Sequence, residues 1–371
     1  MKKTVFILLI AAVGTFLFAF RVGAAENAPE EDAWFAGLWD AVDANTRDLM
    51  EQLGIEGVDA QALLNVSPLD IFTLVGKLAR GEATSPLRYA AASVLILTIA
   101  SFAQTFLPEG GAMRPRCETV GHLCVMFALL AGAGQAVRES MSAVTATEDF
   151  ILCLVPAFTG VIGMAGNPVL ALSWGGAVLA FAETVGAFFA KFVPAAGALG
   201  AALCASANLN AETDLSGAAK LAAKAVTSAM GFVAGIFTAV LTIKDVIAGA
   251  ADTVGMKGLK FVIGQSVPVV GSAVADALNS VAAGLTLLRD TAGAFAVLAL
   301  FLIDLVPVLR LILWKLSFRL IAAAAGVFGA KRAAELTEGL NSLLSVILAA
   351  VCFNSAVFII AVATVIRVKG G

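Results

Sequence analysis

Three polar side chains interrupt long apolar stretches, and they are the residues of this sequence best placed to do chemistry. Each lies inside a window that could cross a membrane: Glu183 in 174–207, Asp304 in 293–314 and Asn354 in 340–366. An ionisable group at the bilayer centre costs roughly 2.5 to 3.5 kcal/mol on insertion scales, so it should face protein or water. These residues are therefore candidates for a pore or ion-coupling site. They are equally candidates for hydrogen bonds between helices, with Asp304 and Asn354 as one such pair.

The sequence carries none of the common motifs of soluble enzymes. GxxxxGK[ST], HExxH, GxSxG and paired CxxC motifs are all absent. The one histidine and the five cysteines, which lie in or beside apolar runs, offer no ligand set for a metal. We therefore predict no catalytic residue, no metal, no cofactor and no enzymatic activity.

Composition indicates a membrane protein. Hydrophobic residues make up 60% of the chain and charged residues only 14%, with a mean hydropathy of +0.94. Spans of about 20 mainly apolar residues are needed to cross a bilayer. The windows that qualify or nearly qualify are 89–106, 121–137, 150–173, 174–207, 225–243, 293–314 and 340–366. They predict an all-α, polytopic helical bundle that occupies residues 89–371.

Several prolines suggest that some of these helices are broken. Pro156, Pro194 and the run Gly166-Asn167-Pro168 fall inside the apolar windows. Proline removes a backbone donor, and a broken helix at membrane depth is tolerated only where protein or water satisfies the freed groups. We therefore expect broken or re-entrant helices at these three places.

The first residues have the pattern of a cleavable signal peptide. Lys2 and Lys3 precede an apolar run from Val5 to Phe20, and small residues follow at 23–25. Cleavage there predicts a leader over residues 1–25 and export of residues 26–88. This second segment has twelve acidic and four basic residues, a net charge of −8, which argues against nucleic-acid binding.

The exported segment is expected to be helical and amphipathic. An apolar stripe at helical spacing contains Trp34, Phe35, Leu38 and Trp39. About sixty residues make a marginal core, so the stripe should pack on the rest of the chain, on membrane lipid or on a partner protein. Packing within the chain is the simpler alternative, and a partner-facing surface is the functional one. Further on, Ser67 before Pro68, with Asp70, predicts a capped helix start.

The distribution of basic residues predicts the orientation. With residues 26–88 outside, the window 89–106 runs inward and 121–137 runs back out toward Glu139. Five basic residues between Arg310 and Arg332 predict a cytoplasmic connection between the last two spans. Glycine pairs such as Gly231 and Gly235 favour close helix packing in a bundle or an oligomer.

The segment 261–289 has a distinct glycine and proline pattern. Pro268 between glycines predicts a re-entrant turn or helix break, and Asp276 is expected to open a small-residue helix that ends at Arg289. This region resembles the signature region of the stage III sporulation protein AE family of endospore-forming bacteria. The positions that carry the resemblance are Phe261, Gly264, Pro268, Gly271, Asp276 and Arg289.

The resemblance extends more loosely from about residue 225 to the C-terminus and brings a set of expectations. It implies a multi-pass protein of the mother-cell membrane that surrounds the forespore. It implies a channel or secretion-like complex with other stage III A proteins and stage II Q, needed for forespore development after engulfment. The family supplies no catalytic residues, and the roles of its motif positions are not implied.

Two other functions remain open on the sequence alone. Broken helices and acids at mid-membrane are also typical of a small-molecule or ion permease acting alone, although no internal repeat is visible. Glycine-rich helix faces and the exported stripe would equally suit an assembly scaffold.

Overall fold

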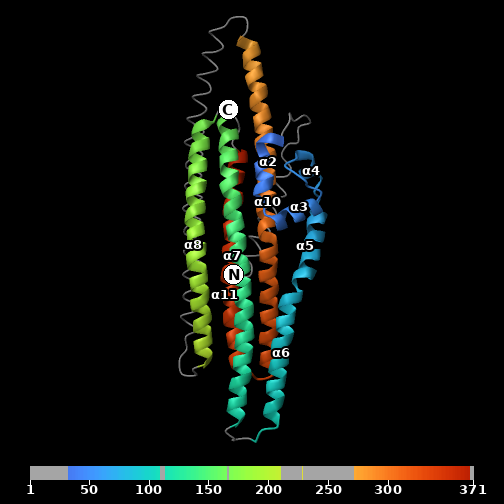
Figure 1. Ribbon diagram of the computed structural model, residues 1–371, viewed down its shortest axis with the longest axis vertical. Helices are drawn as coiled ribbons and strands as arrows, with labels where there is room; N and C mark the ends of the chain where they lie inside the picture. Colours follow the sequence, from blue (N-terminus) through green and yellow to red (C-terminus); the bar gives the residue numbers. More distant parts are fainter. Residues whose placement is uncertain (1–31, 109–112, 165–166, 210–227, 229–270, 368–371) are drawn as a thin grey trace.

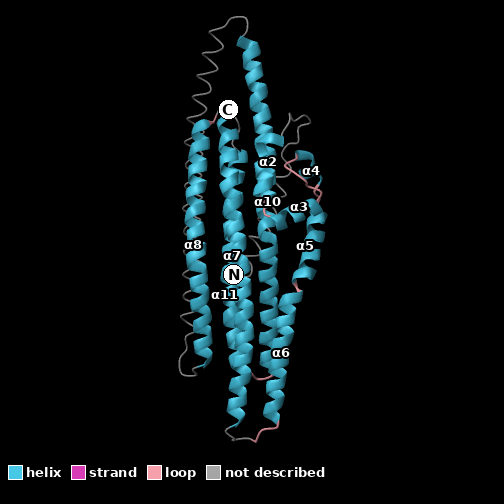
Figure 2. Ribbon diagram, viewed as in Figure 1, coloured by secondary structure: helices cyan, strands magenta, loops and turns pink. Residues whose placement is uncertain are grey.

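The chain folds as an elongated bundle whose long helices run along its longest axis (Figure 1). The computed structural model describes residues 32–108, 113–164, 167–209, 228 and 271–367. Every regular element in these ranges is a helix (Figure 2), which confirms the predicted all-α fold for the part described. The predicted leader, 1–25, and the predicted span 225–243 lie outside these ranges, apart from the single residue 228.

Short helices form the N-terminal part: α2 (Asp32–Ala41), α3 (Ala44–Gln52), α4 (Ala60–Asn65) and α5 (Pro68–Glu82). The last three start at side-chain caps. At α5, Ser67 accepts a hydrogen bond from the Leu69 N–H and Asp70 accepts one from the Ser67 N–H. This capping box confirms the helix start predicted at Ser67, because it satisfies backbone donors that have no partner within the helix.

The N-terminal helices pack on the rest of the chain. Helix α2 lies against α7, while α3, α4 and α5 lie against α10. Their buried apolar side chains belong to the same core as those of the long helices: Leu38, Val42, Leu49, Met50, Ile55, Leu63, Val66 and Leu74. For Leu38, this burial within the chain is the simpler of the two outcomes predicted for the N-terminal stripe.

The long helices are α6 (Thr84–Thr105), α7 (Met113–Met164), α8 (Pro168–Leu209), α10 (Gly271–Val327) and α11 (Lys331–Arg367). Within the described ranges, five helical segments are long and apolar enough to cross a membrane: 68–105, 119–164, 168–189, 290–327 and 331–364. They indicate a membrane protein. At 1.5 Å per residue, α7 extends about 78 Å, well beyond the ~30 Å of bilayer hydrocarbon.

The two windows predicted at 121–137 and 150–173 are not separate spans. Helix α7 runs without interruption from Met113 to Met164 and contains Glu139, which was expected at an outer end. The polar stretch stays helical because it contains no glycine or proline and because Glu139 meets a cation of another helix. One helix therefore replaces the two predicted spans and the polar stretch between them, while the predicted orientation stays a prediction.

Two of the three predicted helix breaks are also absent. Helix α7 continues through Pro156 and α8 continues through Pro194. Around Pro156, the side chains of Leu154, Val155 and Phe158 are fully buried, so tertiary packing holds the helix across the proline. The third break is confirmed: α7 ends at Met164 and α8 begins at Pro168, with the buried Asn167 between them.

Helix α10 also differs from the prediction. The small-residue helix expected to end at Arg289 continues to Val327, so Arg310, Lys315 and Arg319 lie in a helix and not in a connection. The link to α11 is only three residues long and turns at Gly329, which has a φ of +71°. That left-handed conformation suits glycine, because a Cβ there would be strained. The turn folds α10 and α11 into an antiparallel hairpin (Figure 1).

Candidate functional site: polar groups between the helices

Asp304 lies buried in the middle of α10, where it contacts α11 and α7. The Ser355 hydroxyl of α11 donates a hydrogen bond to Asp304 Oδ2, and the Asp304 side chain is only 4% exposed. Thr147 of α7, fully buried, faces the same carboxylate. Three helices therefore bring one carboxylate and two hydroxyl groups together inside an apolar core.

Asn354 is the neighbour of Ser355 and is completely buried. Neither its amide nitrogen nor its amide oxygen has a hydrogen-bond partner. The hydrogen bond that joins α10 to α11 here comes from Ser355 and not from Asn354, its predicted partner. A buried amide without partners costs about 1 to 3 kcal/mol, so this residue lowers stability where it stands.

Glu183 lies apart from these buried groups. Its side chain is exposed on the outer face of α8, beside the exposed Thr184 and Ala187. In a membrane-spanning helix, such a face contacts lipid or another protein. Glu183 is therefore not part of the interior polar cluster of this chain.

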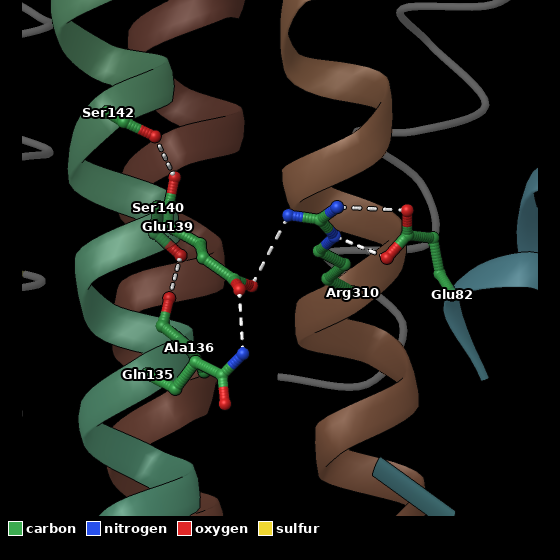
Figure 3. A network of polar contacts seen from close by, with 7 residues as sticks. All are labelled: Glu82, Gln135, Ala136, Glu139, Ser140, Ser142 and Arg310. Atoms are coloured by element: carbon green, nitrogen blue, oxygen red, sulfur yellow. Dashed lines mark hydrogen bonds and ion pairs between the residues drawn. The ribbon is translucent and has the colours of Figure 1, made fainter. Parts of the chain in front are cut away.

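Arg310 joins three helices through ion pairs (Figure 3). Its guanidinium donates two hydrogen bonds to the Glu82 carboxylate at the end of α5, one of them from Nη2 at 2.9 Å. On its other side, Nη1 lies 3.5 Å from Oε2 of Glu139 on α7. Gln135, one turn earlier on α7, donates to Glu139 Oε1 at 3.0 Å. One cation thus neutralises part of the charge of two acids and fixes α5 and α7 to α10.

Glu148 is a further acid between helices. Its carboxylate occupies the space that a Cβ on Gly186 of α8 would fill, so α7 and α8 approach closely at this point. One carboxylate oxygen of Glu148 is buried and has no hydrogen-bond partner. The polar groups of α7 therefore face both α10 and α8.

Comparison with protein families assigns the chain. Residues 77–369 match the family model described as stage III sporulation protein AE. The chain belongs to the stage III sporulation protein AE family. The match includes all of the polar groups described above, from Glu82 to Ser355.

A relative in Bacillus subtilis (strain 168), stage III sporulation protein AE, is similar to this chain. The two are 22% identical over 231 residues, which cover 62% of this chain and 58% of that protein. The match thus spans less than two thirds of the relative's length. No solved structure matches this member of the stage III sporulation protein AE family.

The residues that carried the family resemblance lie before α10 or in its first part. Phe261, Gly264 and Pro268 fall outside the residues that the structure describes. Gly271, Asp276 and Arg289 lie in the first part of α10, where only the backbone is described. Trp34 and Phe35 lie in α2, and there too only the backbone is described.

The other two residues of the N-terminal stripe contact their own chain. Leu38 is 2% exposed, and the Trp39 ring lies against Phe295 of α10 with centroids 6.1 Å apart. A partner could contact Leu38 only if α2 left this packing, whereas Trp39 is half-buried.

Sequence reasoning missed several members of the polar clusters. Thr147 and Ser355 resemble ordinary helical hydroxyl residues, Glu139 was expected at the outer end of a span, and Glu82 was not singled out. The spacing of Gln135 and Glu139, one helical turn apart, was the available signal that this region is helical. Among the described residues, no group of three or more His, Cys, Asp or Glu side chains is placed to hold a metal ion.

Proposed function

We propose that this chain is a membrane component of the channel or secretion-like complex between mother cell and forespore. Family membership supports the sporulation role, and the five apolar helices support the membrane role. One observation carries the step to a channel: Asp304 and Asn354 are buried in the bundle, and the Asn354 amide has no hydrogen-bond partner. Costly polar groups inside membrane helices are typically kept for function.

The proposal includes a location and partners. The chain would lie in the mother-cell membrane that surrounds the forespore, with residues 26–88 in the space between the two membranes after removal of the leader. Its partners would be other stage III A proteins and stage II Q, in an oligomeric complex embedded in lipid. The outward-facing Glu183 supports a protein neighbour, because a carboxylate that faces lipid is costly.

A deletion in the natural host tests this function. We expect cells without the chain to complete engulfment and then to lose late forespore gene expression, with expression restored by the wild-type gene. Antibody capture of a tagged chain should also recover stage III A proteins and stage II Q from sporulating cells. Normal late expression in the deletion strain would contradict the proposed function.

A permease acting alone is the second candidate, and the buried Asp304 is the observation that favours it. The purified chain in liposomes separates the two, because a lone permease moves its solute without partners. An assembly scaffold, the third candidate, would need the helices but not their buried polar groups. Substitution of those groups in sporulating cells therefore distinguishes a scaffold from a conduit.

A further inference from the structure

We propose that the outward face of helices α5 and α6 is a binding surface for an anionic phospholipid, of which phosphatidylglycerol is the representative. In this proposal, Lys77, Arg80 and Arg88 attract and hold the anionic headgroup, and apolar side chains further along α6 contact an acyl chain. The surface belongs to one edge of the chain, so it can be present whether the protein works in a conduit, as a permease or as a scaffold.

The first observation is that one exposed face continues through both helices. The Ala83 N–H donates to the Ala79 carbonyl at 3.1 Å and the Leu87 N–H to the Ala83 carbonyl at 3.0 Å, so helical hydrogen bonding continues where α5 meets α6. Positions three, four, seven or eight apart lie on the same face of a helix. At this spacing, the exposed residues include Lys77, Arg80, Arg88, Leu95, Ile99 and Phe102. The face is therefore basic in its first part and apolar in its second.

The second observation is that these bases have no structural role within the chain. They are three of the four basic residues in the segment 26–88, whose net charge is −8. The fourth, Arg47, donates hydrogen bonds to the carbonyl oxygens of Val42 and Asp40 and so holds the end of α2. No described residue, in contrast, forms an ion pair with any of the other three bases.

The acids of α5 itself are engaged elsewhere. Asp70 accepts a hydrogen bond from the Ser67 N–H at the start of the helix. Glu82 accepts from Arg310 of α10, on the inner side. The positive charge on the outward face is therefore left for a ligand from outside the chain.

The third observation is where the basic part ends. Arg88 directly precedes the apolar window 89–106, and α6 belongs to a segment long and apolar enough to cross a membrane. Tyr89 follows, and tyrosine is enriched at the level of the lipid headgroups. At 1.5 Å per residue, Arg80 and Lys77 lie about 12 and 16 Å further along the helix axis, and their long side chains can reach back toward the membrane surface. Arg88 is thus placed to contact a headgroup phosphate, and the other two bases add attraction.

The fourth observation is that α6 is open to the surrounding membrane. Only 22% of the most apolar window of its segment is buried, against 41 to 67% in the other four candidate spans. Helix α6 lies at an edge of the bundle (Figure 1), and Leu95, Ile99 and Phe102 are each 60 to 65% exposed. Acyl chains can therefore lie along this part of the face.

These features together select a lipid as the occupant. A protein partner would have to present acidic groups beside the bases and apolar groups along α6. An anionic phospholipid carries both in one molecule, in the same order, and basic residues next to a membrane span attract anionic lipids. A zwitterionic lipid offers the same acyl chains without the net negative charge.

Native mass spectrometry of the purified full chain in detergent tests the proposal. The chain is mixed with equal amounts of phosphatidylglycerol and phosphatidylcholine that carry identical acyl chains. We expect phosphatidylglycerol to be retained in preference, on the order of tenfold, because three bases face its headgroup. Equal retention of the two lipids would overturn the proposal. Displacement of the lipid by inorganic phosphate, but not by chloride at the same ionic strength, would overturn a lipid as the occupant.

Matched variants locate the effect. A variant with Lys77→Gln, Arg80→Gln and Arg88→Gln should lose the preference, and a control with Arg319→Gln, Lys331→Gln and Arg332→Gln should keep it. The control removes the same charge from exposed positions of α10 and α11. A preference that persists in the first variant, or that is lost equally in the control, would overturn this surface.

Two further results complete the test. If the first triple variant does not fold, the single changes Arg88→Gln and Arg319→Gln are compared, and only Arg88→Gln should weaken the preference. If the variant keeps the lipid preference but loses capture of a partner protein from cells, the face binds a protein and the proposal is overturned.

Discussion

Arg310 of α10 donates two hydrogen bonds to the carboxylate of Glu82, a residue 228 positions earlier in the sequence. The pair fixes the end of α5, the last of the short N-terminal helices, to α10 of the long-helix bundle. Glu139 of α7 completes the contact on the other side of the guanidinium (Figure 3).

Arg310→Ala should destabilise the protein. The change leaves Glu82 and Glu139 without their shared cation, and because both acids are about a quarter exposed, we expect a loss of about 1 to 2 kcal/mol in the free energy of unfolding. Arg319→Ala is the control, since Arg319 is exposed on the same helix. Denaturant unfolding in detergent measures both, and equal losses would show that the ion pairs contribute nothing.

Gly132→Ala should be destabilising because Trp314 leaves no room for a methyl group. A Cβ on Gly132 of α7 would collide with the Trp314 ring, which is 2% exposed and packs on Tyr89 with ring centroids 5.2 Å apart. Overpacking of this kind costs about 1 to 3 kcal/mol. Gly176→Ala on α8 meets no atom within 4 Å and should be neutral or stabilising. Similar Tm values for the two variants would reject this packing.

Thr145→Pro tests whether α7 is continuous between residues 139 and 149. Thr145 is exposed in mid-helix and its hydroxyl donates to the Met141 carbonyl. Proline there should cost about 3 kcal/mol or more, because it removes a backbone donor and clashes with the preceding turn. Thr145→Ala, which keeps the backbone intact, should unfold at nearly the wild-type temperature. If Thr145→Pro unfolded at the same temperature as Thr145→Ala, the result would favour a loop between residues 139 and 149.

Asn354→Leu should stabilise the protein while impairing its function. Leucine has the same branched shape as asparagine and removes an amide that is buried without partners, so we expect a gain of about 1 kcal/mol in the free energy of unfolding. Asn65→Leu, at an exposed position, should leave stability unchanged. Unfolding in detergent and spore counts are measured on the same variants. Full sporulation with Asn354→Leu would contradict a functional role for the amide.

The buried positions of Asp304 and Asn354 could be predicted because each lies near the centre of a long apolar window. Composition and periodicity also predicted the helical bundle, and the motif of residues 261–289 predicted the family. These features depend on local sequence, which determines hydropathy and helix start signals such as the Ser67 cap.

The partners of the buried groups could not be predicted, because they depend on contacts far apart in the sequence. Asp304 and Ser355 are 51 residues apart, and Arg310 is 171 residues from Glu139. The sequence does not show that Glu139 meets Arg310, so the polar stretch after Val137 had the composition of an exposed loop. Pro156 similarly predicted a break, because the packing that holds α7 straight comes from other helices.

The central claim is that the buried carboxylate of Asp304 serves the function of the complex and not merely its assembly. Heat-resistant spore yield in cells that carry Asp304→Ala, compared with Ser140→Ala, tests this claim most directly when chain abundance and capture of partner proteins are measured in the same cells. We predict a severe loss of spores with Asp304→Ala at normal abundance and normal capture, and no loss with Ser140→Ala. A normal spore yield with Asp304→Ala would contradict the account.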